Sequence, residues 1–509
     1  MAASDPAPPN TRLRKNAVGV LGILFFVLSA QAPLTGIAGA TPLSVGIGNG
    51  AGAPGAYLLI GIMITIFAVG FIAMSRHVTD AGAFYAYIGR GLGRPTGTGS
   101  ALTALWCYGT VQAAMYGLYG AVVSGLLAQY GHVTVPWWIC AVITMLVIQG
   151  VGSFGIDMGA RVLAVLVGLE ISILLAFAFG VLFTGGGGHG GSISVAASFS
   201  PSHVLSGAPG IAIVFAIASM LGFESTAIYA EEAKDPKRTV PRATYLSVVL
   251  IAVFFAFVTW MLVSYYGATH AVPAAGAALK SGGTAFLFNA VSGMLGSWAG
   301  TAANFLLASS LLAGILAFHN GINRYVYSLG HHGTLPIAVS RVNRHGAPWI
   351  AATIQTVMAL ALVLPFAISG SDPVLTLFAW FSGVAVLALM VLYFLTTVSV
   401  VTFFARTKAE TRPWQTRIAP VLAGLMILGV TYLVIANFTT LIGGSRTTAT
   451  WLMITVPVVF VLGLVLNAAT KSHAHRWRPG NAPAPAPAPA AGSTAPTTLT
   501  GLPVLASDG

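Results

Sequence analysis

Long stretches without any charged residue are the feature that most limits how this chain can fold. The main uncharged intervals are 17–75, 95–156, 171–223, 243–279, 281–323, 345–371, 373–405, 418–445 and 447–470. A hydrocarbon core of about 30 Å needs roughly 20 apolar residues per helix, so each interval can hold one or two spans. The alternation that marks the strands of a membrane β-barrel is absent from the sequence. The sequence therefore predicts an all-α polytopic membrane protein.

Composition agrees with this class, since 56% of the 509 residues are hydrophobic and only 7% are charged, far from the usual balance of a soluble domain. About twelve transmembrane helices follow from the length rule. They are expected at 17–47, 52–75, 98–129, 134–153, 157–183, 208–233, 242–266, 299–328, 347–368, 374–404, 416–441 and 448–469.

The distribution of basic residues predicts the orientation of the chain. With these spans, all but two of the 23 Lys and Arg residues fall on one side, the exceptions being Lys280 and Arg446. Short cytoplasmic loops are enriched in Lys and Arg, so both termini are expected in the cytoplasm and the protein in the plasma membrane. The same rule explains the net charge of +12 without a nucleic-acid partner. Residues 1–16 and the Pro/Ala-rich segment 470–509 are expected to be cytoplasmic tails, the second one disordered.

Enzymatic and metal-binding chemistry finds little support. The two cysteines, Cys107 and Cys140, both lie within predicted spans, which favours neither disulfides nor a thiolate metal site. A membrane-embedded enzyme would need an acidic metal motif or clustered histidines, whereas Asp80 and Asp157 are isolated. No Walker A motif is present. We therefore expect no catalytic residue, no metal and no cofactor.

Two predicted spans carry helix-breaking signals in their interior. The first contains SAQAPLTGIAGATP (29–42), and the sixth contains ASMLGFES (218–225). Non-helical backbone at membrane depth is tolerated only where protein buries it or it lines a cavity. The breaks open two successive groups of five spans, 17–183 and 208–405, which is the arrangement of an inverted-repeat transporter. The segment 416–469 then supplies helices 11 and 12.

Three segments together resemble the amino acid–polyamine–organocation permeases: AGAFYAYIGRGLG (81–93), GFESTAIYAEEAKDPKRTVPRA (222–243) and NGINRYVYSLGHHGTLP (320–336). The similarity runs over roughly 16–405. It implies a LeuT-type fold with ten helices in two inverted halves, discontinuous helices 1 and 6, and a substrate held where they unwind.

The resemblance also implies a function. We expect a secondary active permease that moves an amino acid or related organic amine across the cytoplasmic membrane, driven by protons. Sodium-coupled or exchange transport on the same fold stays open, as does a nutrient sensor that binds without transporting. The substrate and the direction of transport do not follow from the sequence.

The resemblance assigns substrate contacts to both breaks. Aligning Pro42 with the proline after the family's first break places Thr35, Gly36 and Ile37 where members often have Gly-Ser-Gly. Their backbone is expected to bind the substrate carboxylate, as the N-terminus of a half-helix can. Close helix packing is the alternative role of the glycines.

On helix 6 the matching residues are Ala218, Ser219, Leu221 and Gly222. The carbonyls of the first three are the candidates to meet the substrate amine, while Gly222 belongs to the break. Ala218 occupies a position where some relatives have a large aromatic gate, so a smaller side chain here would widen the pocket.

Two acids, Glu170 and Glu224, fall in the interior of predicted spans, where insertion of a charge is costly. By resemblance, Glu224 belongs to the core behind the break in helix 6 and can sense protons; alternatively its carboxyl ties up freed N–H groups. Glu170 lies where several proton-coupled relatives have a lysine in the space of a sodium site. It is expected either to carry the coupling proton or to bind a cation, with a structural bond from helix 1 or 8 as the alternative.

Helix 3 presents a polar-aromatic stripe. Tyr108, Gln112, Tyr116 and Tyr119 share one helical face by their spacing, and Tyr108 and Gln112 are candidate substrate contacts. On helix 10, Trp380 is a candidate to close over the substrate. Packing or interfacial anchoring is the alternative for these aromatic residues.

Overall fold

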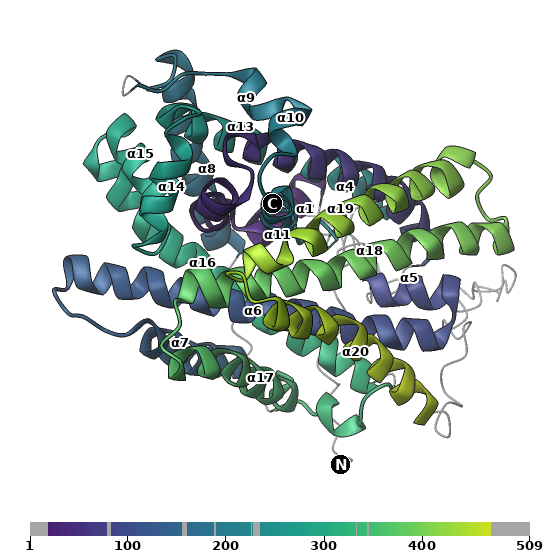
Figure 1. Ribbon diagram of the computed structural model, residues 1–509. Helices are drawn as coiled ribbons and strands as arrows, with labels where there is room; N and C mark the ends of the chain where they lie inside the picture. Colours follow the sequence, from purple (N-terminus) through teal and green to yellow (C-terminus); the bar gives the residue numbers. More distant parts are fainter. Residues whose placement is uncertain are drawn as a thin grey trace, which may run out of the picture.

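The computed structural model describes residues 19–78, 83–154, 160–187, 190–224, 226, 235–331, 333–343 and 346–469. Within these ranges every regular element is a helix (Figure 1). Nine of these helices are long and apolar enough to cross a membrane. The expected tails, and residues 227–234 at the end of the sixth predicted span, lie outside the described residues, as do Asp80 and Asp157.

Each of the twelve predicted spans overlaps a helix in the described residues, which confirms the all-α polytopic architecture. The helices at these positions are α1 (Val20–Gln31), α4 (Ala53–Ser75), α6 (Arg94–Tyr130), α7 (Trp137–Ser153), α8 (Ala160–Phe183), α11 (Pro209–Ser219), α13 (Pro236–Tyr266), α16 (Ser297–His331), α17 (Trp349–Ile368), α18 (Ala379–Thr407), α19 (Ala419–Leu441) and α20 (Arg446–Ala469).

Shorter helices occupy the connections, for which no secondary structure was predicted. They are α5 (Ala83–Leu92), α9 (Val195–Phe199), α10 (Pro201–Val204), α14 (Ala271–Leu279) and α15 (Ala285–Leu295). All are far below the roughly 20 residues needed to span a bilayer, so a length rule passes over them. α5 packs against both α6 and α18.

The first span is interrupted at one residue. α1 ends at Gln31, and Ala32 adopts φ 43°, a left-handed conformation. Pro33 explains the position, because proline has no N–H to continue the helix and disfavours helical backbone in the residue before it. The chain then continues through α2 (Pro33–Thr35), a π-helix (Gly36–Ala40), α3 (Thr41–Leu43) and a second π-helix (Ser44–Gly48). The expected break over 29–42 is thus confined to Ala32, with Gly36 and Pro42 in helical backbone.

The sixth span is interrupted where α11 ends at Ser219. Residues Met220 to Glu224 form turns, and Gly222 has φ 116°, a region that side chains strongly disfavour. Glycine at this position therefore permits the sharp change of direction in the middle of the span.

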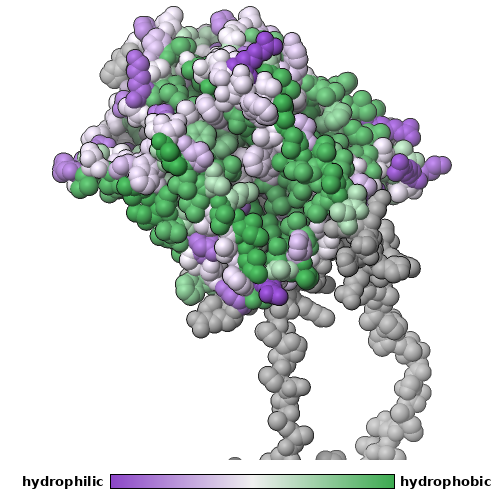
Figure 2. Space-filling model, turned by 60° about the horizontal axis from the view of Figure 1, so that its bottom comes forward, coloured by the Kyte–Doolittle hydropathy of each residue, from purple (hydrophilic) through white to green (hydrophobic). Residues whose placement is uncertain are grey.

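The outer surface matches a lipid environment. Figure 2 shows an extensive hydrophobic area across the middle of the molecule, with hydrophilic residues gathered toward its margins. Leu146, Val165, Val357, Leu425 and Val461 are among the exposed apolar side chains of the protein. A soluble protein rarely exposes so large an apolar surface, so this is a multi-pass membrane protein.

Candidate functional site

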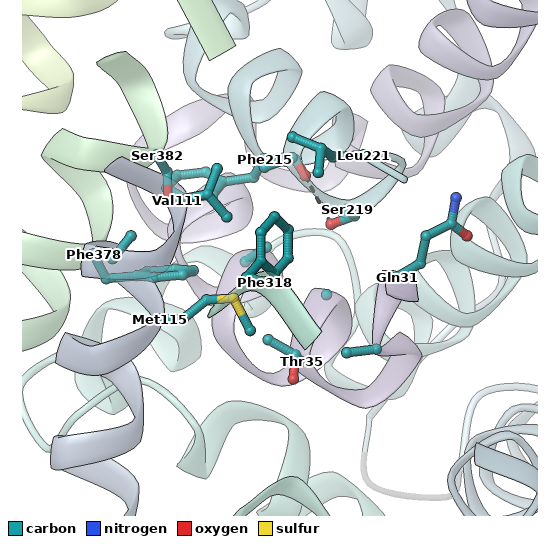
Figure 3. Close-up of a pocket in the computed structure, with 15 residues that line it drawn as sticks. Gln31, Thr35, Val111, Met115, Phe215, Ser219, Leu221, Phe318, Phe378 and Ser382 are labelled. Atoms are coloured by element: carbon teal, nitrogen blue, oxygen red, sulfur yellow. Dashed lines mark hydrogen bonds between the residues drawn. The ribbon is translucent and has the colours of Figure 1, made fainter. Parts of the chain in front are cut away.

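A cavity lies between the two interruptions (Figure 3). Its walls come from the first span, α6, α11, α16, and the segment made of a π-helix (Pro373–Phe378) and α18. The lining residues are Gln31, Ala32, Thr35, Gly36, Ala40, Val111, Ala114, Met115, Phe215, Ala218, Ser219, Leu221, Phe318, Phe378 and Ser382. Segments nearly 350 residues apart in the sequence therefore share one site.

The polar groups of the cavity are few and uncharged: Gln31, Thr35, Ser219 and Ser382. The Gln31 side-chain amide donates to the carbonyl of Met220 at 3.2 Å, which joins the end of α1 to the interruption of the sixth span. Ser219 donates to the Phe215 carbonyl at 2.8 Å. Gln31 Oε1 and Thr35 Oγ1 are buried without a hydrogen-bond partner in the described chain. Buried polar atoms are rarely left unpaired, so both are available to a ligand.

Five of the predicted contacts line this cavity: Thr35, Gly36, Ala218, Ser219 and Leu221. The Gly36 N–H is already bonded to the Ala32 carbonyl at 3.2 Å, because the helix resumes directly after Ala32. Ile37 is fully buried and is not among the lining residues. A role of these residues in binding substrate stays a prediction.

Tyr108, Gln112, Gly222 and Trp380 lie outside the lining of the cavity. Gln112 donates to the Ile315 carbonyl at 3.3 Å and accepts a hydrogen bond from Gln355. It thereby joins α6 to α16 and α17 through a buried amide pair. Trp380 packs edge-on against Phe366 with ring centroids 5.5 Å apart. The expectation that these four residues meet the substrate also stays a prediction.

Glu224 caps the interruption of the sixth span. Its Oε2 accepts a hydrogen bond from the Gly222 N–H at 2.9 Å, and its Oε1 accepts one from the Tyr108 hydroxyl at 3.4 Å. The side chain is buried, with 4% of its surface exposed. The carboxyl thus pairs an N–H freed by the break, as the structural alternative expected, and it also ties the break to α6.

Glu170 performs the corresponding task at the first interruption. Its Oε2 accepts a hydrogen bond from the Leu34 N–H at 3.2 Å, and its residue surface is fully buried. Glu170 Oε1 has no partner within the described part of the chain. The expected bond from helix 1 is therefore present, while a role in ion coupling stays a prediction.

Sequence reasoning missed most of the apolar wall, namely Val111, Met115, Phe215, Phe318 and Phe378. A signal existed on α6: Val111 and Met115 are four residues apart, as residues on one helical face must be. That face lies one residue, roughly 100°, from the predicted stripe of Tyr108 and Gln112. The residues of the neighbouring face were predicted instead because they are polar.

The fold and the cavity define a multi-pass membrane protein with two discontinuous spans beside one cavity. Amino acid permease is the family whose model matches, over residues 25–480. The chain therefore belongs to the amino acid permease family, which confirms the resemblance seen in the sequence.

Individual relatives are distant. The histidine permease HisP of Lactococcus lactis subsp. cremoris (strain MG1363) is 24% identical over 327 residues, which cover 62% of this chain and 65% of the relative. A cadaverine/lysine antiporter of Escherichia coli (strain K12) is 25% identical over 193 residues, covering 38% and 41%. The branched-chain amino acid permease BcaP of the same Lactococcus strain is 30% identical over 167 residues, covering 31% and 32%. The chain thus matches less than two thirds of the length of these relatives.

Proposed function

We propose that this protein is a secondary active permease that moves an amino acid across the cytoplasmic membrane. The observation that carries the proposal is the cavity that lies between the interruptions of the first and sixth spans. Discontinuous helices that meet at the middle of the bilayer are the usual substrate sites of secondary transporters. Membership of the amino acid permease family supports the same reading.

The substrate that suits this cavity is a neutral amino acid with an apolar side chain. Val111, Met115, Phe215, Phe318 and Phe378 offer apolar surface, and among the described residues no acidic or basic side chain lines the cavity. A cationic side chain buried there would lack a counter-charge, which is strongly unfavourable. Among the relatives, the printed specificities include histidine, lysine with cadaverine, and branched-chain amino acids; the lining favours the last kind.

Protons are the coupling ion that we propose, with Glu170 as the carrier. A carboxyl that accepts the Leu34 N–H at 3.2 Å binds it more strongly when ionised than when protonated. Proton binding would therefore loosen the start of the resumed helix, next to the Thr35 and Gly36 wall of the cavity. The orientation that we propose, with both termini in the cytoplasm, rests on the Lys and Arg distribution.

Uptake by proteoliposomes tests the proposal. Leucine, phenylalanine, lysine, histidine and cadaverine are offered in turn, under an inward proton gradient, an inward sodium gradient, or no gradient. We expect accumulation of leucine or phenylalanine under the proton gradient only, abolished by a protonophore. Accumulation that follows sodium would overturn proton coupling, and preference for lysine or cadaverine would overturn the neutral substrate. Binding without accumulation under any gradient would identify a sensor.

A further inference from the structure

A second cavity, which shares no lining residue with the first, is lined by two arginines. It lies between α5, the beginning of α6 and the end of α16 with the loop that follows. The residues around it are Tyr85, Ala86, Gly89, Arg90, Arg94, Gly97, Thr98, Ala101, Leu329 and Thr334. Five of them carry guanidinium or hydroxyl groups, and none carries a carboxylate.

Backbone geometry brings the two arginines to the same cavity. Arg90 is in the last turn of α5, and Arg94 is the first residue of α6. Gly93 between them has φ 98°, which reverses the chain so that the two helices pack together. At their crossing, a Cβ on Gly97 would lie 2.9 Å from Gly89 Cα. The glycines therefore let the two helix backbones pack closely, which brings both arginines to the wall of one cavity.

Within the part of the chain that the structure describes, no carboxylate pairs with either arginine of this cavity. Ion pairs in the described ranges are Arg238 with Asp235 and Arg412 with Glu410. Arg90 is exposed and Arg94 half-buried, so both can reach a ligand from outside. Two guanidinium groups beside the hydroxyl of Thr334 match the donors that a phosphate group recruits.

We propose that this cavity binds the phosphate group of an anionic phospholipid. Arg94 is the first residue of a helix that is long and apolar enough to cross a membrane, and basic residues that flank such helices on the cytoplasmic side attract anionic head groups. Basic pockets between transmembrane helices are suited to such head groups. This inference is independent of the substrate and of the coupling ion.

The cavity is connected by ring contacts to the interruption of the sixth span. Tyr85, in its wall, packs edge-on against Tyr325 with ring centroids 5.4 Å apart. Tyr325 in turn contacts Tyr108 at 6.5 Å, and Tyr108 donates to Glu224. A head group held against Tyr85 therefore stabilises the packing behind the break.

The test uses the full-length protein purified with native lipid and reconstituted into nanodiscs of phosphatidylcholine alone or mixed with phosphatidylglycerol. Native mass spectrometry counts retained phosphatidylglycerol, and thermal unfolding measures its effect. The double variant Arg90→Ala/Arg94→Ala should lower the apparent affinity for phosphatidylglycerol roughly tenfold and remove its stabilisation. The matched control Arg341→Ala/Arg417→Ala loses the same charge at exposed positions and should behave as the parent protein.

An equal loss of phosphatidylglycerol binding in both double variants would mean that the lipid responds only to general surface charge, and this result would overturn the site. Inorganic phosphate is the second probe: stabilisation by phosphate in phosphatidylcholine nanodiscs, equal to that by phosphatidylglycerol, would overturn a lipid as the ligand. Because Arg90 is exposed, the single variant Arg90→Ala folds even if the double variant does not, and unchanged lipid retention by it would also contradict the proposal.

Discussion

The carboxylate of Glu170 on α8 lies 3.2 Å from the backbone N–H of Leu34, immediately after the interruption of the first span. Pro33 has no N–H, so Leu34 carries the first amide of the resumed helix. The first amides of a helix lack intrahelical partners, and water is excluded from a fully buried site such as that of Glu170. A side chain from another span thus caps a helix that begins inside the membrane.

Replacement of Glu170 separates its capping role from its proposed coupling role. In Glu170→Gln the amide oxygen can still accept from Leu34, but the side chain no longer exchanges a proton. We expect substrate binding and thermal stability near those of the parent protein, with loss of accumulation driven by a proton gradient. Glu170→Ala leaves the buried N–H unpaired and should also destabilise the protein by about 1–3 kcal/mol.

Thermal unfolding and proteoliposome uptake, measured on both variants, distinguish these effects. Glu410→Gln, in a loop outside the spans, is the control for the removal of a carboxylate. Normal proton-driven accumulation by Glu170→Gln would contradict the coupling role and leave Glu170 with the capping role only.

Removal of the Tyr108 hydroxyl is the second experiment. This hydroxyl donates to the Glu224 carboxyl at 3.4 Å and so joins α6 to the interruption of the sixth span. Tyr108→Phe removes this bond and keeps the ring. Since Tyr108 is outside the cavity lining, we expect an unchanged KM for uptake and a maximal rate changed about tenfold, as loss of a hydrogen bond to a charged group predicts. Tyr432→Phe, on the exposed surface of α19, is the control. A raised KM with an unchanged rate would instead place Tyr108 in contact with substrate.

The spans could be predicted from sequence because apolar length is a local property, and every predicted segment overlaps a helix. Pro33 likewise indicated the first interruption. Its extent was overestimated, because Gly36 and Pro42 break a helix only where no tertiary packing holds it, and here both are buried.

The cavity wall was harder to predict. Val111 and Phe318 line the cavity, yet an apolar residue that faces a ligand looks the same in sequence as one that faces lipid or a neighbouring helix. Polar residues such as Gln112 attract attention instead, although a buried amide also pairs with another helix. The bond from Leu34 to Glu170 joins positions 136 residues apart, a pairing that only the fold defines.

The amide pair of Gln112 and Gln355 makes a third prediction. Gln112→Leu or Gln355→Leu alone leaves the other amide without its partner in a buried site, so each single variant should be destabilised. The double variant should be destabilised by less than the sum, with a coupling energy of about 0.6 kcal/mol or more. Thermal unfolding of the parent protein, the two single variants and the double variant, measured in detergent, completes this double-mutant cycle. Strict additivity would show that the pair contributes nothing to helix association, and a changed KM in Gln112→Leu alone would favour a contact with substrate.

A fourth prediction concerns the close approach of Gly36 to α13. A Cβ at Gly36 would lie 2.6 Å from the ring of Phe255, and that ring is stacked on Tyr57 with centroids 5.5 Å apart. Gly36→Ala should therefore displace the first span and cost about 1–3 kcal/mol, with a loss of uptake because Gly36 lines the cavity.

The compensating variant Gly36→Ala/Phe255→Leu should recover much of the stability and uptake, since the smaller side chain vacates the space that the new methyl group needs. Gly168→Ala on α8 is the matched control, because no atom lies within 4 Å of its added Cβ. If steric crowding causes the loss, only the added Phe255→Leu substitution should restore the Gly36→Ala variant. If Gly36→Ala transports normally, the first span has room to move away from Phe255; if Phe255→Leu fails to rescue, the glycine is needed for its backbone rather than for its size.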